Sequence, residues 1–231
     1  MSVSIKGFLE ASFLDWPGKI TAVIFLPGCN FRCCWCHNAA LVTDSEHLAH
    51  VPLPVIMERI GEFSGWIDGI CITGGEPTIH KDLPDFITLF KEKGLGVKLD
   101  TNGSNPQMLE ALIQDRLIDC AAMDIKAPLD DARYARLTGV PVDLDQIRAS
   151  IAVLRSSAIE TIFRMTVVPD LLTEEDICQA ARDIKPVRQL TLQQFKPDNT
   201  LDPSLRTLTP WSAEKLQLIQ ARVQDILGTV D

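Results

Sequence analysis

Three cysteines in one short stretch of the chain have a spacing that suits an iron–sulfur centre. Cys29, Cys33 and Cys36 follow the pattern C-x3-C-x2-C, directly after the apolar run Thr21–Leu26. Three thiolates from one loop can hold three irons of a cubane cluster and leave the fourth iron open, whereas a closed cluster has four cysteine ligands. An open iron can bind a small molecule and pass it an electron, so the spacing predicts a catalyst. The alternatives are a disulfide pair or a zinc site with His37 as fourth ligand, although zinc ligands usually come as two separated pairs.

The loop resembles that of the radical S-adenosylmethionine (SAM) enzymes, whose signature is the same spacing with an aromatic residue before the last cysteine. That aromatic residue is Trp35 here. The resemblance implies that Cys29, Cys33 and Cys36 ligate a 4Fe–4S cluster and that Trp35 lies beside the bound cofactor. Cys34 fits none of the ligand positions.

The stretch Gly74-Gly75-Glu76-Pro77 follows the next apolar run. Two glycines free the backbone to approach a ligand closely, because they lack a Cβ atom. In the radical SAM family the corresponding stretch cradles the amino group of SAM, which implies that Gly74, Gly75 and Glu76 bind the cofactor. The alternative is an ordinary turn from a strand into a helix.

Two later motifs resemble a narrower group of the family, the activating enzymes of glycyl radical enzymes. In the formate-lyase activase of that group, the corresponding positions enclose a monovalent cation, Na⁺ or K⁺, beside the carboxylate of SAM. Those positions are Asp100, Thr101, Asp124 and the main-chain carbonyl of Ala122, and Lys126 matches a lysine near the cofactor. Carboxylates and a hydroxyl suit such an ion. The alternative is that both aspartates cap strand ends and that Lys126 is solvated.

Two basic residues complete the predicted site. Arg164 precedes Val167-Val168-Pro169, and its guanidinium could hold a carboxylate or form an ordinary salt bridge. Lys196 stands where the formate-lyase activase has a histidine that touches the cofactor, so the adenosyl contacts on that side differ. The stretches around Leu14–Lys19 and Pro27–Arg32 are most similar to anaerobic ribonucleoside-triphosphate reductase activating proteins.

The resemblance implies an oxidoreductase that reductively cleaves SAM to a 5′-deoxyadenosyl radical. The radical would abstract a glycine Cα hydrogen from a partner glycyl radical enzyme, with anaerobic ribonucleotide reductase expected as that partner. Flavodoxin or ferredoxin would donate the electron, under anaerobic conditions. One alternative is a radical SAM enzyme acting on a small molecule or peptide, similar to 7-carboxy-7-deazaguanine synthase. Another is a non-catalytic iron–sulfur or zinc protein.

Composition and charge exclude several classes of protein. Apolar residues make up 46 % of the 231 residues, which excludes a disordered chain, and the net charge of −9 argues against a nucleic-acid partner. No apolar run approaches the ~18–20 residues that span a membrane, and the N-terminus lacks a signal-peptide pattern. We therefore expect a cytoplasmic protein without a membrane partner. Cys71, Cys120 and Cys178 lie singly in apolar segments and are predicted to be buried.

Alternating apolar runs and helical patterns must position these residues, and they predict an α/β fold with a parallel sheet. The predicted strands are Thr21–Leu26, Gly69–Thr73, Gly96–Asp100, Cys120–Ile125, Thr161–Val167 and Gln189–Gln194. The predicted helices are Pro54–Phe63, Leu83–Lys93, Pro106–Asp115, Leu144–Arg155, Thr173–Ile184 and Ser212–Leu227. Six β/α units are too few for a closed eight-stranded barrel. The resemblance implies an open partial (β/α)6 TIM-like barrel.

The polar motifs all follow predicted strands, so they should meet at the carboxyl end of the sheet. We predict a single radical SAM domain over residues 1–231. It would comprise an N-terminal extension (1–20), a β/α core (21–200) and a C-terminal helical segment (201–231).

Overall fold

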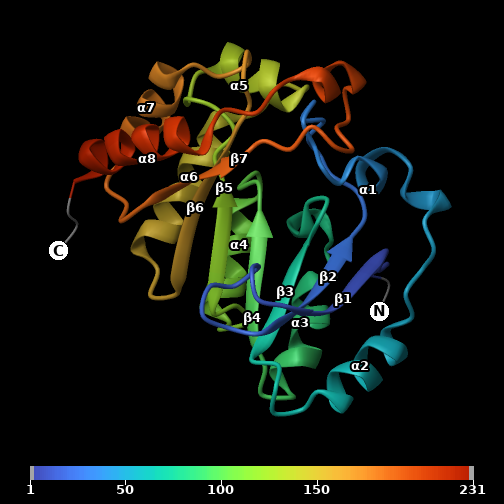
Figure 1. The fold of residues 1–231 in the computed structure, drawn as a ribbon. Helices are drawn as coiled ribbons and strands as arrows, with labels where there is room; N and C mark the ends of the chain where they lie inside the picture. The colour runs from blue at the N-terminus through green and yellow to red at the C-terminus, as the bar shows by residue number, and fades with distance from the viewer. Residues whose placement is uncertain (1–2, 229–231) are drawn as a thin grey trace.

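The computed structural model describes residues 3–228, whose strands form one seven-stranded sheet (Figure 1). The strands lie in the order of the sequence: β1 (Gly7–Ser12), β2 (Thr21–Leu26), β3 (Gly69–Gly74), β4 (Gly96–Thr101), β5 (Cys120–Asp124), β6 (Glu160–Val167) and β7 (Leu190–Gln194). Strands β2 to β7 are parallel, and β1 is antiparallel to β2. In the described part of the chain β1 and β7 are the two edges of the sheet, which confirms the predicted open partial barrel.

Helices lie in the connections between the parallel strands, and one further helix, α8, follows the last strand. They are α1 (Ala39–Thr43), α2 (Leu53–Glu62), α3 (Leu83–Lys91), α4 (Pro106–Gln114), α5 (Asp131–Thr138), α6 (Leu144–Ser156), α7 (Glu174–Asp183) and α8 (Ala213–Leu227), with short 3₁₀ turns η1 (Ser45–His47), η2 (Pro77–Ile79) and η3 (Pro203–Thr207). Figure 1 shows α3, α4 and α6 on the same side of the sheet. This arrangement follows from the strand order, because crossovers that always advance in one direction place their helices on one face.

Besides the 3₁₀ turns, one strand and two helices of the structure were not predicted: β1, α1 and α5. Strand β1 is an edge strand with few buried residues, so its apolar pattern is weak. Helix α5 is largely polar, and its buried residues are Tyr134, Leu137 and Thr138. The other predicted helices and strands are confirmed, with differences of one or two residues at their ends.

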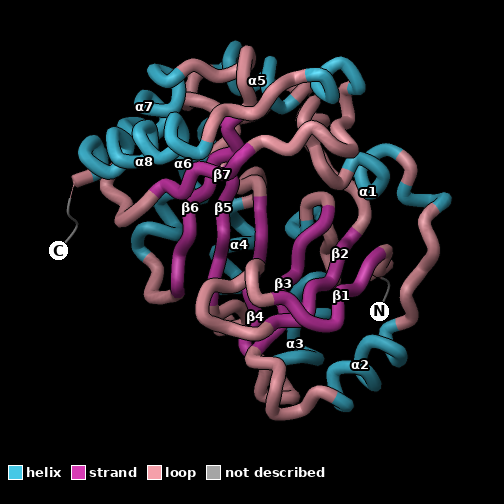
Figure 2. The backbone as a smooth tube through the Cα atoms, viewed as in Figure 1, coloured by secondary structure: helices cyan, strands magenta, loops and turns pink. Residues whose placement is uncertain are grey.

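Trp16 closes the end of the barrel that lies opposite the carboxyl ends of the strands. Its ring is fully buried, and its Nε1 donates a hydrogen bond of 2.8 Å to the carboxylate of Glu160. A Cβ atom added to Gly69 or Gly96 would lie 3.1 or 3.3 Å from the ring. These three partners begin β6, β3 and β4, and Figure 2 shows the loop between β1 and β2 crossing this end of the sheet. The site must therefore lie at the other end.

Of the remaining predictions on the fold, the burial of three cysteines is confirmed and the domain organisation is not tested. Cys71, Cys120 and Cys178 are fully buried as predicted, and all seven cysteines of the chain are free. Over residues 3–228, no helix is long and apolar enough to cross a membrane. The single-domain organisation stays a prediction, and its outermost residues, 1–2 and 229–231, lie outside the described part.

Candidate active site

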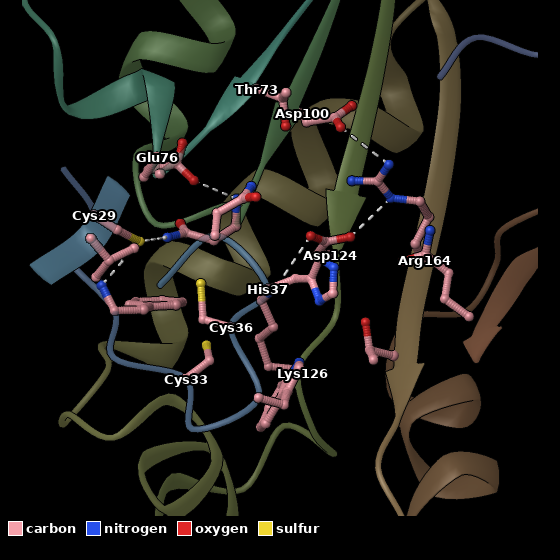
Figure 3. A pocket seen from close by; sticks show the side chains of 18 of the residues that line it. Cys29, Cys33, Cys36, His37, Thr73, Glu76, Asp100, Asp124, Lys126 and Arg164 are labelled. Atoms are coloured by element: carbon pink, nitrogen blue, oxygen red, sulfur yellow. Dashed lines mark hydrogen bonds and ion pairs between the residues drawn. The ribbon is translucent and has the colours of Figure 1, made fainter. Parts of the chain in front are cut away.

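Except for Ala122, which pairs with Asp100 between β4 and β5, every residue predicted for the site lines one cavity of about 530 Å³ at the carboxyl ends of the parallel strands (Figure 3). These residues are Cys29, Cys33, Trp35, Cys36, Gly74, Gly75, Glu76, Asp100, Thr101, Asp124, Lys126, Arg164 and Lys196. The volume falls within the ~300–1,000 Å³ of typical small-molecule sites. Residues from distant parts of the sequence meet here because parallel strands end at one edge of the sheet.

The cysteine loop packs directly against the end of β3. The N–H of Gly75 donates to the carbonyl of Leu26, and the N–H of Glu76 donates to the carbonyl of Gly28, both over 2.8 Å. A Cβ atom on Gly75 would lie only 1.7 Å from the oxygen of Gly28, and Gly74 has a φ of +119°. The two glycines thus let the loop approach the strand, and because both also line the cavity, the ligand approach expected from the sequence stays a prediction.

Two unpredicted helices hold the other side of this loop. The N–H of Gly28 donates to the carbonyl of Leu41 in α1 over 2.8 Å. The N–H of Arg32 donates to the carbonyl of Thr138, the last residue of α5, over 2.7 Å. Gly139 caps α5 in the left-handed region, with a φ of +71°, and a Cβ atom there would lie 2.5 Å from the oxygen of Arg32. Helices α1 and α5 therefore fix the position of the loop.

The sulfur atoms of Cys29, Cys33 and Cys36 face the same open space (Figure 3). The Sγ of Cys29 also accepts hydrogen bonds from the N–H of Phe31, at 3.3 Å, and from the side-chain amide of Asn102, at 3.9 Å. Burial raises the pKa of all three thiols, that of Cys33 to about 12. Binding to a metal would remove these protons, since thiolates are the ligands. Three free thiols on one cavity fit a three-cysteine cluster.

Glu76 is enclosed among hydrogen-bond donors. Its Oε1 accepts from the N–H of Thr78 (3.1 Å), the hydroxyl of Thr78 (2.5 Å) and the hydroxyl of Thr101 (2.8 Å). Its Oε2 accepts from the N–H of Asn102 at 2.6 Å. Burial, the largest influence, raises the pKa of Glu76 despite these bonds. The carboxylate therefore ties the end of β3 to the end of β4.

A row of five charged side chains crosses β4, β5 and β6. Lys98 pairs with Asp100, whose other oxygen accepts from Arg164 Nη1 at 3.2 Å. Arg164 Nε donates to Asp124 at 2.9 Å, and the second oxygen of Asp124 accepts from Lys126 Nζ at 3.1 Å. Burial alone would raise the pKa of Asp124, but the two cations hold it at about 2. The same attractions raise the pKa values of Lys98, Lys126 and Arg164 although burial acts to lower them.

Among the residues that were not predicted, Lys98 and Asn102 contact predicted site residues: Lys98 pairs with Asp100, and Asn102 lines the cavity beside Cys29. Lys98 lies two residues before Asp100 on β4, so strand alternation places both on one face. That spacing is the signal that could have indicated the pair. Asn102 belongs to the Asp100–Gly103 motif, but nothing in the sequence indicates that its amide reaches Cys29.

Comparison with known proteins agrees with this geometry. The sequence model of the radical SAM superfamily matches residues 23–184. A Methanocaldococcus jannaschii protein, whose name describes a glycyl-radical enzyme activating enzyme, is 35 % identical over 213 residues, covering 90 % of this chain and 86 % of the relative. The pyruvate formate-lyase-activating enzyme of Clostridium pasteurianum is 26 % identical over 96 % of this chain and 98 % of its own length.

A solved structure supports the fold. A domain of the pyruvate-formate lyase-activating enzyme from Bacteroides vulgatus superposes with a TM-score of 0.54 at 17 % identity, covering 68 % of this chain and 94 % of the domain. Because the superfamily pattern covers more than half of the sequence and a 35 % identical relative matches most of it, the chain belongs to the radical SAM superfamily and, within it, to the glycyl-radical enzyme activating enzymes.

Proposed function

We propose that this chain uses SAM to generate a stored glycyl radical on anaerobic ribonucleotide reductase. The observation that carries this proposal is that one cavity brings together the cysteine loop and the other residues predicted to bind the cofactors. The two relatives that match most of the chain are both named as activating enzymes, which supports the reaction class. The choice of ribonucleotide reductase rests on the motifs around Leu14–Lys19 and Pro27–Arg32.

Membership of the radical SAM superfamily implies a 4Fe–4S cluster and SAM as cofactors. In our proposal Cys29, Cys33 and Cys36 hold the cluster. When bound, these cofactors supply the electron transfer that cleaves SAM and the 5′-deoxyadenosyl radical that removes a glycine Cα hydrogen. Gly74 and Gly75 position the amino group of SAM through their main chain. Glu76 acts on the same group by fixing the rim of the cavity.

The other cavity residues hold the remainder of SAM. In our proposal Trp35 lies beside the cofactor, and Lys126 places a positive charge near its carboxylate. Lys196, on the β7 side of the cavity, contacts the adenosyl part. Arg164 forms the salt bridges that were the alternative to holding a ligand carboxylate, because its Nε and Nη1 donate to Asp124 and Asp100; a role in binding the cofactor stays a prediction.

The predicted Na⁺ or K⁺ beside Asp100, Thr101 and Asp124 remains a prediction. All four carboxylate oxygens of these aspartates have basic partners within the protein. The hydroxyl of Thr101 donates to Glu76. A cation bound there would have to share these oxygens with the basic side chains.

The partner and the electron donor complete the proposal. A protein loop carrying the glycine enters the cavity, which this short chain covers with few residues beyond the core. Flavodoxin or ferredoxin reduces the cluster, and the reaction takes place in an anaerobic cytoplasm, where free thiols such as the seven cysteines persist.

The test is an anaerobic activation assay with the reconstituted protein, SAM, reduced flavodoxin and anaerobic ribonucleotide reductase. We expect a glycine-centred doublet by electron paramagnetic resonance and 5′-deoxyadenosine in an equal amount. The control is Cys36→Ala, which should give neither product. Formation of 5′-deoxyadenosine without a glycyl signal would contradict the proposed partner and point to another glycyl radical enzyme or to a small-molecule substrate.

A further inference from the structure

Lys98 is a lysine in the interior of the barrel. Only 1 % of its side chain is exposed, and it pairs with Asp100, two residues ahead on the same face of β4. Its neighbours in register on the two adjacent strands are Cys71 in β3 and Cys120 in β5. Both are small, which leaves room for the long side chain, and Lys98 Nζ lies 3.7 Å from the sulfur of Cys71. A lysine is almost never so deeply buried without a specific partner.

The ammonium group of Lys98 is the third positive charge in the row of five charged side chains that crosses β4, β5 and β6. Asp100 and Asp124 contribute two negative charges, whereas Lys98, Arg164 and Lys126 contribute three positive charges. The row therefore carries a net charge of +1 (three minus two). Without Lys98, Asp100 would keep Arg164 alone, and one of its oxygens would face the interior without a partner. A buried carboxylate in that state needs another cation.

A bound Na⁺ or K⁺ and the ammonium of Lys98 would compete for the same oxygen of Asp100. The two are alike in charge, and an ammonium is a compact point charge. Adding the ion while Lys98 remains would place two positive charges beside each other in a poorly solvated interior, where repulsion is strong. The donor set around Asp100 and Asp124 therefore does not fit a further cation.

We propose that the ammonium group of Lys98 takes the place of a bound monovalent cation, so that SAM binding by this chain requires neither Na⁺ nor K⁺. Lys98 is then a positioning residue, which holds Asp100 and, through Arg164, the rim of the cavity. This inference rests on the proposed function, since it assumes that SAM binds beside Asp100.

The first measurement uses the cluster-loaded wild-type protein. SAM affinity is measured anaerobically in KCl, NaCl and tetramethylammonium chloride of equal ionic strength, so that screening is constant. Tetramethylammonium is too bulky to replace a small ion. We expect the dissociation constant for SAM to change by less than about twofold among the three salts. A tenfold or larger loss of affinity in tetramethylammonium would show that the protein uses a bound ion and would overturn the proposal.

The second measurement uses Lys98→Ala, which leaves a vacant space at the ammonium position. In tetramethylammonium we expect SAM affinity to fall ~10-fold or more, because Asp100 loses its partner in the interior. KCl or NH₄Cl should restore most of the affinity and raise the melting temperature of the variant, but not that of the wild type. The matched control is Lys91→Ala, which removes a lysine–aspartate pair nearer the surface and should show no ion-specific response.

The melting temperature is read without SAM, so the two proposals can fail separately. If the wild type binds no SAM in any salt, the proposed function fails, and ion-specific stabilisation of Lys98→Ala still supports the role of Lys98. If Lys98→Ala binds SAM with the same affinity, and melts at the same temperature, in tetramethylammonium chloride, KCl and NH₄Cl, the proposal on Lys98 is wrong. Should Lys98→Ala not fold in tetramethylammonium, its recovery on refolding in NH₄Cl or KCl supports the proposal, and failure in every salt leaves the decision to the wild-type measurement.

Discussion

Cys33 and Cys34 are adjacent in sequence but lie in different surroundings. Cys33 is buried and lines the cavity, whereas Cys34 is half-buried, lies outside it, and accepts a hydrogen bond from the N–H of Asp202 at its carbonyl. We expect Cys33→Ala to lose the cluster, because three thiolates are needed, and Cys34→Ala to keep wild-type iron content and SAM cleavage. Iron analysis and visible absorbance after anaerobic reconstitution measure the cluster in both variants, and the yield of 5′-deoxyadenosine measures SAM cleavage. Loss of iron from Cys34→Ala at an unchanged melting temperature would contradict our ligand assignment.

The sequence predicted the residues of the cavity better than the contacts among them. Asp100, Asp124 and Arg164 were identified from the resemblance to the activating enzymes, and the rule that polar residues at the ends of parallel strands meet predicted that they would lie together. Their partners did not follow, because Lys98 belongs to a residue type that is ordinarily solvated. Glu76 shows the same limit, since four donors from three residues surround a carboxylate that the motif suggests is free for a ligand.

At the scale of elements, the strongly patterned segments were predicted and the weakly patterned ones were not. Helix α7 was predicted from Thr173, which is its N-cap: the Thr173 hydroxyl accepts from the N–H of Asp176, and the Asp176 carboxylate accepts from the N–H of Thr173. Helix α5 has few apolar positions, so its pattern gave no signal, yet it holds the cysteine loop through Thr138 and Gly139. Its formation depends on tertiary contacts, which periodicity cannot show.

The contact between the cysteine loop and β3 leads to a prediction at this scale. In Gly75→Ala the new methyl group would overlap the oxygen of Gly28, so the loop must move away from the strand. We expect the free energy of unfolding to fall by ~1–3 kcal/mol, as in other overpacked sites, and iron retention to fall with it. Urea unfolding and iron analysis measure the two effects.

Gly61→Ala is the matched control for that experiment. Gly61 lies in α2, and nothing lies within 4 Å of an added Cβ atom. Alanine has the higher helix propensity, so this variant should be unchanged or more stable by up to ~1 kcal/mol. Equal behaviour of the two variants would mean that the close approach of Gly75 to Gly28 does not hold the loop.

At the scale of the whole molecule, the open sheet has two edges that need protection. A barrel that stops at six parallel strands leaves an entrance for a partner, but an unpaired edge invites pairing with other chains. Helix α8 covers the edge at β7 through Gln220, whose Oε1 accepts from the N–H of Leu192 and whose Nε2 donates to the carbonyl of Leu190, both over 2.9 Å. The side-chain amide thus supplies the two bonds that a further strand would make.

Gln220→Ala should therefore weaken the molecule where the barrel ends. The variant leaves the main-chain groups of Leu190 and Leu192 without these partners, so we expect the free energy of unfolding to fall by ~1–3 kcal/mol. We also expect self-association to increase, because the edge of β7 becomes free to pair. Gln217→Ala, on an exposed position of the same helix, should stay within ~0.5 kcal/mol of the wild type. Urea unfolding and light scattering compare the variants, and equal stability of the two would mean that packing of α8 alone protects the edge.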